Sequence, residues 1–228
     1  MTMKKININL QDICNYEINI FNSNYTKMTQ ELIDFDIENW KQSLWYKYYT
    51  TYCPKNLNDI YKTNIDTLKN LSPQTIFEPW THDYPIPTYK FKRLGMFGPK
   101  NKNYIYQQIK KTKSLITSIQ KNGFIESNEI NNNIVVEILK FNDKIKYLVT
   151  SGNHRINVLK ALGFKNVNVC LKQNAHLKSK NLINNKIYDK NKPYRTIINY
   201  NSADNWPAVK SNYMSKKNAQ DMFKAYFN

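Results

Sequence analysis

A short polar turn near the middle of the chain carries the residue types best suited to binding an anion. Apolar residues 147–149 lead into residues 151–155 (Ser-Gly-Asn-His-Arg), and a helical pattern follows until Gly163. Glycine lets backbone approach a ligand, and the first N–H groups of a helix lie unpaired at its positive end. His154 adds a titratable donor, and Arg155 adds a permanently charged fork suited to phosphate. The pattern predicts a phosphate-binding turn; the alternative is a polar turn that is only solvated.

Arginine and glycine are scarce in this chain, which adds weight to the ones in this turn. The sequence has 34 Asn and 31 Lys but only three Arg and five Gly. Such a skew is typical of an AT-rich genome, so the Arg and Gly that remain are candidates for specific roles. All five glycines lie between residues 95 and 163. We therefore expect the chemistry of the protein in this window.

The bulk composition limits the class of protein. A chain of 228 residues fits one elaborated domain or two small ones, and 41% hydrophobic content excludes global disorder. No apolar run is long enough for a membrane span, and the start lacks the apolar core of a signal peptide. The cysteines follow no pairing pattern and the histidines are far apart, which predicts a cytoplasmic protein without a metal site.

The net charge of +17 leaves two interpretations open. It favours a polyanionic partner, but the charge comes from lysines spread along the chain. A surface that reads DNA sequence would normally keep arginine for paired contacts with bases. Either a solvated basic surface or genuine steering of anions fits this distribution.

The helix expected at residues 103–121 carries a second candidate group. Four isoleucines from Ile105 to Ile119 form an apolar arc with helical period. Beside it, Lys111, Ser114 and Ser118 share one stripe, spanning roughly 10 Å along the axis. The stripe could line a cleft and donate to phosphates; the alternative is an ordinary boundary between buried and exposed faces.

The remaining patterns predict an α+β protein in three segments. Segment 1–75 holds a strand pair in 1–25 and helices at 30–52 and 56–71; segment 76–175 holds the helix and the turn above; segment 176–228 ends in an amphipathic helix at 215–227. Within the middle segment, residues 134–139 and 145–149 predict a hairpin that turns at Asn142-Asp143. A further strand is expected at 167–171, and residues 172–192 are polar and loop-like.

The order of helix 111–122, glycine, hairpin, Ser-Gly-Asn-His-Arg, helix and strand 167–171 resembles the ParB/sulfiredoxin-like fold over about residues 90–172. The resemblance implies a small mixed sheet with helices, plus helical extensions at both ends. In sulfiredoxins a Gly-Cys-His-Arg turn binds ATP phosphates with help from a Lys-x-x-Ser-x-x-x-Thr helix, and in ParB proteins the corresponding turn binds CTP. The nucleotide-binding residues so implied are Lys111, Ser114, Ser118, Ser151, Gly152, Asn153, His154 and Arg155.

Two features of this sequence differ from the family and exclude some of its activities. Asn153 stands where sulfiredoxin has its reactive cysteine, so reduction of cysteine sulfinic acid is not expected. No helix-turn-helix pattern follows the turn, so sequence-specific DNA binding is not expected either. The tail resembles that of uncharacterised ParB-like proteins encoded near surface-glycan genes.

Three functions fit these observations. The first is an ATP-dependent phosphotransferase, since free-serine kinases share the fold, using ATP or CTP with Mg²⁺ and a small hydroxylated metabolite or sugar as acceptor. Its catalytic residues would be His154 and a carboxylate from segment 76–84, Asp83 before Glu78, although both acids could be ordinary surface groups. The second is a non-catalytic CTP- or ATP-gated module that binds DNA or a protein. The third is a scaffold without nucleotide. The acceptor and the oligomeric state, including a homodimer, stay open.

Overall fold

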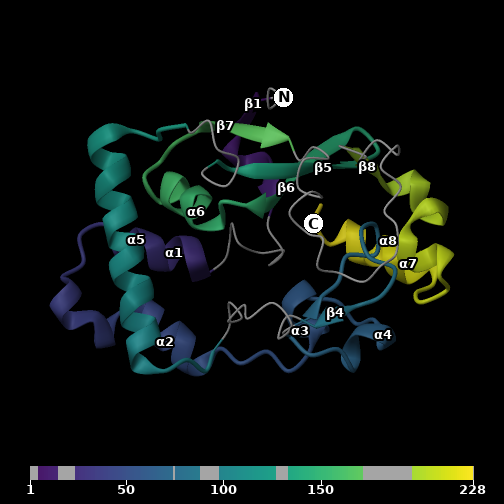
Figure 1. The fold of residues 1–228 in the computed structure, drawn as a ribbon, viewed down its shortest axis with the longest axis horizontal. Helices are drawn as coiled ribbons and strands as arrows, with labels where there is room; N and C mark the ends of the chain where they lie inside the picture. The colour runs from purple at the N-terminus through teal and green to yellow at the C-terminus, as the bar shows by residue number, and fades with distance from the viewer. Residues whose placement is uncertain are drawn as a thin grey trace, which may run out of the picture.

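The computed structural model describes residues 5–14, 24–73, 75–87, 98–126, 133–171 and 197–227. These residues form an α+β protein around a mixed six-stranded sheet (Figure 1). The strands are β1 Lys5–Asn9, β2 Ile13–Cys14, β5 Val135–Phe141, β6 Lys144–Ser151, β7 Asn166–Leu171 and β8 Ile197–Asn199, with β3 Thr75–Ile76 and β4 Ile86–Pro87 paired separately.

The helices include two long ones that matter most for the site, α5 and α6. The α-helices are α1 Asn24–Glu31, α2 Leu44–Thr51, α3 Leu57–Tyr61, α4 Asp66–Lys69, α5 Lys102–Asn122, α6 Asn153–Ala161, α7 Pro207–Lys210 and α8 Lys216–Lys224. The 3-10 turns are η1 Leu10–Asp12, η2 Ile37–Gln42 and η6 Tyr200–Asn205. Within the described ranges, none of the helices combines the length and apolar character needed to cross a bilayer.

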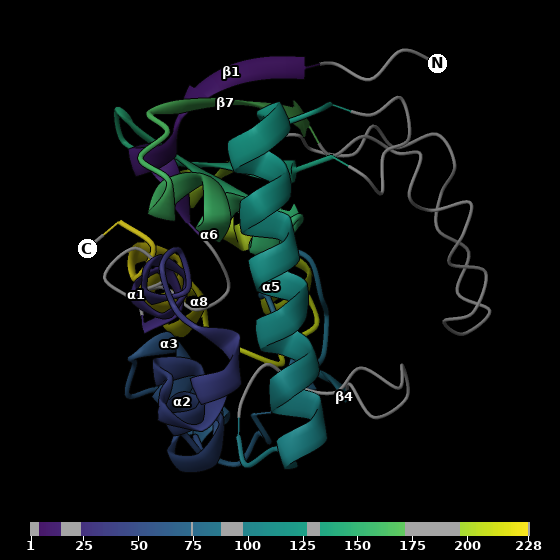
Figure 2. The same cartoon turned by 90° about the vertical axis from the view of Figure 1, so that its left-hand side faces the viewer.

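The sheet is built around the hairpin of β5 and β6. Its order is β1-β7-β5-β6-β2, and β8 pairs with β5 beyond the short stretch that β7 occupies. The hairpin turns at Asn142, whose φ is 52°, and Asp143, as the sequence predicts. β2 runs parallel to β6, whereas β1 lies antiparallel along β7 (Figure 2). The sheet therefore takes strands from all three segments that the sequence divides, and not from 76–175 alone.

The two faces of the sheet bury two different hydrophobic clusters. Neighbouring strand residues point to opposite faces. Ile13 and Val149 join the cluster that α1, α2, α5 and α6 cover, and Cys14 and Leu148 join the cluster that α3, α4, α7 and α8 cover. The two helical groups lie on opposite sides of Figure 1. We call these the α5–α6 face and the α7–α8 face.

Helix α5 matches the expected helix closely. The Asn101 side chain accepts a hydrogen bond from the Tyr104 N–H at its start, and Gly123, with φ of 69°, ends it. In its middle, the Lys113 ammonium donates to the carbonyls of Leu32, Ile33 and Phe35 at distances of 2.7, 2.8 and 3.1 Å. These carbonyls belong to the turn that follows α1, so Lys113 fixes the end of α1 against α5.

The two N-terminal helices that the sequence predicts are each divided in the structure. Residues 30–52 contain the end of α1, η2 and α2, because Asp36 and Ser43 accept hydrogen bonds from the Glu38 and Tyr46 N–H groups and start new helices there. Residues 56–71 contain α3 and α4, separated where Lys62 turns left-handed with φ of 54°. Apolar spacing carries on through both interruptions, which explains the wrong lengths. The expected strand residues Ile18 and Ile20 and the loop 172–192 lie outside the described residues.

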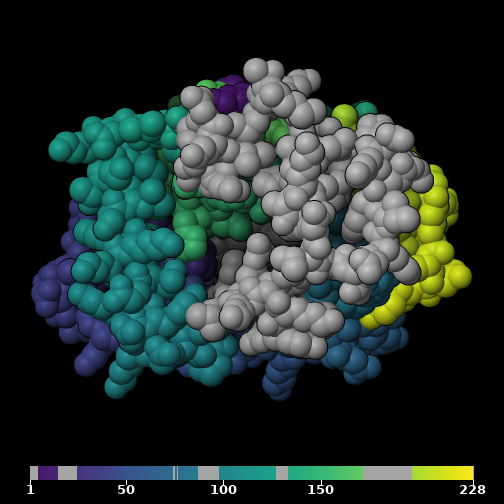
Figure 3. Space-filling view, viewed as in Figure 1, coloured from purple at the N-terminus to yellow at the C-terminus, as the bar shows by residue number. Residues whose placement is uncertain are grey.

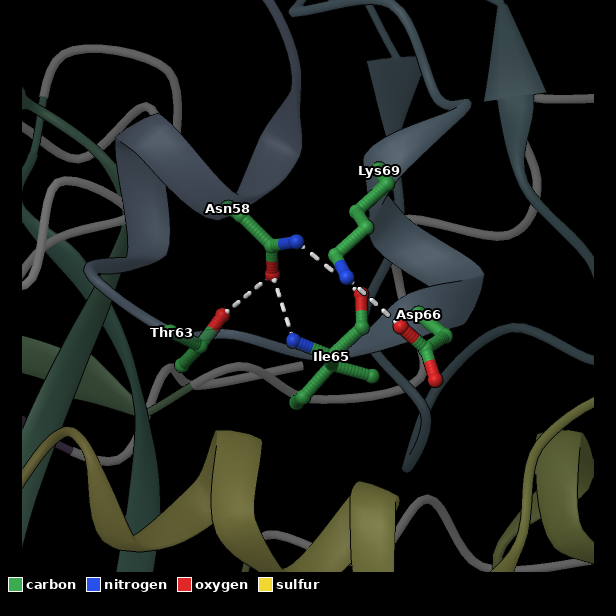
Figure 4. Close-up of polar contacts among 5 residues, drawn as sticks. All are labelled: Asn58, Thr63, Ile65, Asp66 and Lys69. Carbon is green, nitrogen blue, oxygen red and sulfur yellow. Dashed lines mark hydrogen bonds and ion pairs between the residues drawn. The ribbon is translucent and has the colours of Figure 1, made fainter.

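One asparagine organises the connection between α3 and α4 (Figure 4). Asn58 is 8% exposed, and its amide donates to the Ile65 carbonyl at 2.9 Å. Its oxygen accepts from the Thr63 hydroxyl at 2.8 Å and from the Ile65 N–H at 3.0 Å. An exposed ion pair, Lys69 to Asp66, closes the next turn at 2.8 Å. We refer to residues 58–65 as the Asn58 turn.

Candidate anion-binding site

The start of α6 depends on Gly152. β6 ends at Ser151, and Gly152 adopts the left-handed region with φ of 94° and ψ of 19° before α6 begins. A Cβ at this position would meet the Cα and Cγ1 of Ile134 at 3.0 Å and the Asn133 carbonyl at 3.3 Å. The close approach that glycine allows here is therefore to the segment entering β5. We call residues 151–155 the α6 turn.

His154 lies in the first turn of α6 with its ring turned inward. The ring packs edge-on against Tyr25 of α1, with centroids 6.1 Å apart and planes at 78°. Its Nε2 atom is buried and has no hydrogen-bond partner among the described residues. Burial lowers the pKa of His154 below its ordinary value, and the charges of Lys111 and Arg155 lower it further. The imidazole is therefore held neutral in an electropositive setting.

Two cations accompany His154, from two different helices. Arg155 is the next residue of α6, and Lys111 comes from the middle of α5, which packs against α6. Figure 3 shows the atoms of α5 and α6 next to each other on one face of the molecule. In the described part of the chain, neither Lys111 nor Arg155 forms an ion pair or a side-chain hydrogen bond. Positive charge at the start of α6 is therefore not neutralised by these residues.

Asn157 ties the first turns of α6 and α1 together. Its side chain is 2% exposed, its amide donates to the Asn153 carbonyl at 2.9 Å, and its oxygen accepts from the Thr26 hydroxyl at 3.3 Å. The Asn153 side-chain oxygen is also buried, without a partner among the described residues. The sequence analysis missed Tyr25, Thr26 and Asn157. Only Asn157 left a signal, as a lone polar residue within the apolar run Ile156 to Leu159.

The other predicted binding residues lie near this turn but make fewer contacts. Ser114 and Ser118 are exposed on α5, on the same stripe as Lys111. In the described ranges no hydrogen bond joins either serine to α6. Ser151 is half-buried at the end of β6, opposite Val135. The structure thus brings Lys111, His154 and Arg155 together and leaves the two serines beside them.

Of the two candidate acids, Glu78 is the one held against the sheet. It is 1% exposed, and its N–H donates to the His82 Nδ1 at 3.2 Å. Burial raises the pKa of Cys14 and of Tyr61, and the charge of Glu78 raises both further. Glu78 therefore lies near Cys14 at the end of β2, on the α7–α8 face, whereas α6 covers the opposite face of the sheet.

Asp83 lies farther along the same segment and contacts the C-terminal helices. Its backbone carbonyl accepts a hydrogen bond from the Ser211 hydroxyl at 2.9 Å, at the end of α7. Its side chain is partly exposed. Nothing in these contacts directs the Asp83 carboxylate toward α6, and the contacts given for Glu78 lie on the α7–α8 face as well.

In the described ranges, no three His, Cys, Asp or Glu side chains gather closely enough to hold a metal ion. Cys14 and Cys170 are buried free thiols, and Cys53 is an exposed one.

Comparison with known proteins adds no relative, since no protein-family model, curated protein or solved structure matches the chain. Function must therefore be argued from the residues themselves.

Proposed function

We propose that the α6 turn and Lys111 bind the phosphate groups of a nucleotide, ATP or CTP, which would carry its own Mg²⁺. One observation supports this most: at the start of α6 the Nε2 of His154 is buried with no partner among the described residues, and the charges of Lys111 and Arg155 both act on this ring. A buried polar atom without a partner costs about 1–3 kcal/mol. A phosphate would satisfy these groups together and would also accept from the N–H groups of α6.

The reaction we propose is phosphoryl transfer from ATP to a small hydroxylated metabolite or sugar, in the cytoplasm. Such transfer needs stabilised phosphate charge and an oriented acceptor. His154 and Arg155 would donate to the phosphate oxygens, as the resemblance to the ParB/sulfiredoxin-like fold implies. An acid of segment 76–84 would orient the acceptor hydroxyl. Glu78 is the one tested below; its neighbour Cys14 belongs to the α7–α8 face, whereas α6 covers the other face of the sheet, so the acceptor would have to reach past the end of β6.

The second candidate is a non-catalytic module that a bound nucleotide switches toward a protein or DNA partner. The observation that favours it is electrostatic. The charges that act on His154 are both cationic, so the contacts support holding a phosphate more directly than transferring it. Under this proposal Glu78 is a buried structural acid of the α7–α8 face.

Arg155→Ala tests whether the site binds nucleotides at all. Thermal-shift and titration assays with ATP, CTP, GTP and sugar nucleotides, each with Mg²⁺, should find a ligand for the unchanged protein. The substitution should weaken its binding by about 1.5–3 kcal/mol, roughly tenfold to 150-fold, because a charge-assisted fork to phosphate is lost. The matched control is Lys110→Ala, which removes an exposed cation beside Lys111. Equal affinity in Arg155→Ala and the unchanged protein would place the pocket elsewhere.

Glu78→Gln separates the two candidate functions. The protein with ATP, Mg²⁺ and a panel of hydroxylated metabolites should release ADP, and Glu78→Gln should slow release while keeping ATP affinity. Asp83→Asn is the matched control within the same segment and should leave the rate nearly unchanged. ATP binding without turnover for any acceptor would support the binding module.

A further inference from the structure

The described helices packed around His154 bring one aromatic ring and two cations to it, and burial and the two cations oppose its protonation. From α1 it meets the ring of Tyr25, from α5 the charge of Lys111, and from its own helix the charge of Arg155. The N-terminal end of α6 adds positive potential of its own. The ring is also largely removed from water, so a proton on it would be poorly solvated.

A bound dianion would favour protonation of His154 instead of opposing it. Two negative charges beside the ring would offset Lys111, Arg155 and the helix end, and would give the buried Nε2 a hydrogen-bond acceptor. The same anion that these cations attract thus makes a charged imidazole favourable.

We propose that the α6 turn takes up a proton on His154 when it binds phosphate, and that it thereby selects a doubly charged terminal phosphate over singly charged groups such as phosphodiesters. This inference rests on the proposed function, since it concerns the same site. It adds a preference for dianions and a dependence of the binding affinity on pH, neither of which phosphate binding alone requires.

The direction of the pH dependence follows from the two states of His154. Its pKa lies below the ordinary 6.5 without ligand and should rise when a dianion is bound. Affinity is therefore highest at low pH and falls as pH rises through the interval between the two pKa values. Within that interval the fall approaches tenfold per pH unit. Lys160, at the far end of α6, has a pKa that burial and Lys146 lower to about 7, so it titrates in a similar pH range. The protonation of His154 must therefore be measured on its own ring.

Sulfate is the probe that isolates this effect, because it stays a dianion over the whole interval while phosphate itself titrates. Imidazole NMR signals of the unchanged protein, titrated with and without sulfate at constant ionic strength, give the pKa of His154. Calorimetric titrations in buffers of different ionisation enthalpy give the protons taken up. We expect sulfate to raise the His154 pKa and to bind with partial uptake of one proton.

Two variants complete the test. His154→Gln should bind sulfate with an affinity that no longer falls with pH, whereas His176→Gln should keep the fall. Sulfate could bind, and bind more weakly to Arg155→Ala, without changing the pKa of His154. That result would overturn the proton uptake but would still support phosphate binding at this turn. No binding of sulfate, phosphate or nucleotide to the unchanged protein at any pH would overturn the proposed function itself.

Discussion

Two turns in this molecule each contain an asparagine with buried polar atoms, and they differ in what they leave unpaired. In the Asn58 turn, the buried side chain uses both its oxygen and its amide on the connection between α3 and α4 (Figure 4). In the α6 turn, the Asn153 oxygen and the His154 Nε2 are buried with no partner among the described residues. Both turns start or join helices, yet only the first is complete by itself.

The difference is the reason for proposing a ligand at the α6 turn. Buried polar groups in folded proteins nearly always have partners, and each exception needs an explanation. At the α6 turn the exceptions lie near two cations from different helices, and an anion is the partner that we propose. At the Asn58 turn the buried amide uses both its oxygen and its nitrogen, although Asn58, Asp59 and Lys62 also line an open pocket.

Breaking the backbone of the α6 turn should have the largest effect. Gly152→Ala combines a left-handed backbone with contact against Ile134, and should lower the free energy of unfolding by about 2–4 kcal/mol. Gly163→Ala is the matched control, because Gly163 has φ of 79° but nothing within 4 Å of an added Cβ. It should cost about 1–2 kcal/mol. Equal losses in urea unfolding would mean that crowding against Ile134 contributes nothing.

Replacing Asn58 and Asn153 by alanine tests the difference between the two turns directly. Asn58→Ala removes the described partner of the Ile65 N–H, while the Ile65 carbonyl keeps the Leu68 N–H; it should cost about 1–3 kcal/mol in urea unfolding, with nucleotide affinity unchanged. Asn153→Ala removes an oxygen that bonds to no described residue, so it should change stability by only about 0.5 kcal/mol. A large loss in Asn153→Ala would show that its side chain is structural, like that of Asn58.

The smallest expected effect is the dependence of stability on pH through His154. Its pKa is lowered in the folded state, so below the unfolded value of 6.5 the unfolded chain binds more protons. Stability should therefore decline as pH falls from 6.5 toward the folded pKa, and His154→Gln should lose this part of the decline. Urea midpoints at about pH 7.5 and about pH 5.5 measure it. An identical decline in His154→Gln would assign it to other groups.

The sequence predicts well those elements whose signals are local. Helix α5, the β5–β6 hairpin, α6 and β7 follow from apolar period and from glycines at their ends. The partition of α1 from α2 was missed, because apolar spacing carries on through the caps at Asp36 and Ser43. The place of β1, β2 and β8 in the central sheet was missed as well, because strand pairing between distant segments leaves no local pattern.

The residues of the candidate site also fall into those with a local sequence signal and those without one. Arg155, His154 and Lys111 were found because their residue types and spacing are unusual in this composition. Tyr25, Thr26 and Asn157 were not, since their roles arise only when α1 packs on α6, and the Thr26–Asn157 bond joins residues 131 apart.

The pairing of β1 with β7 has a consequence for how the protein is made. Asn7 and Asn168, which bond across these strands, are 161 residues apart, so β1 leaves the ribosome long before its partner exists. At ordinary rates of synthesis that interval lasts about 10–30 s. During it, the alternating isoleucines of β1 have no strand to pair with, whereas β5, β6 and α6 can assemble from neighbouring sequence. We expect closure of β1 onto β7 to be a late, slow event of folding, and the nascent chain to be most open to aggregation or chaperone capture before it.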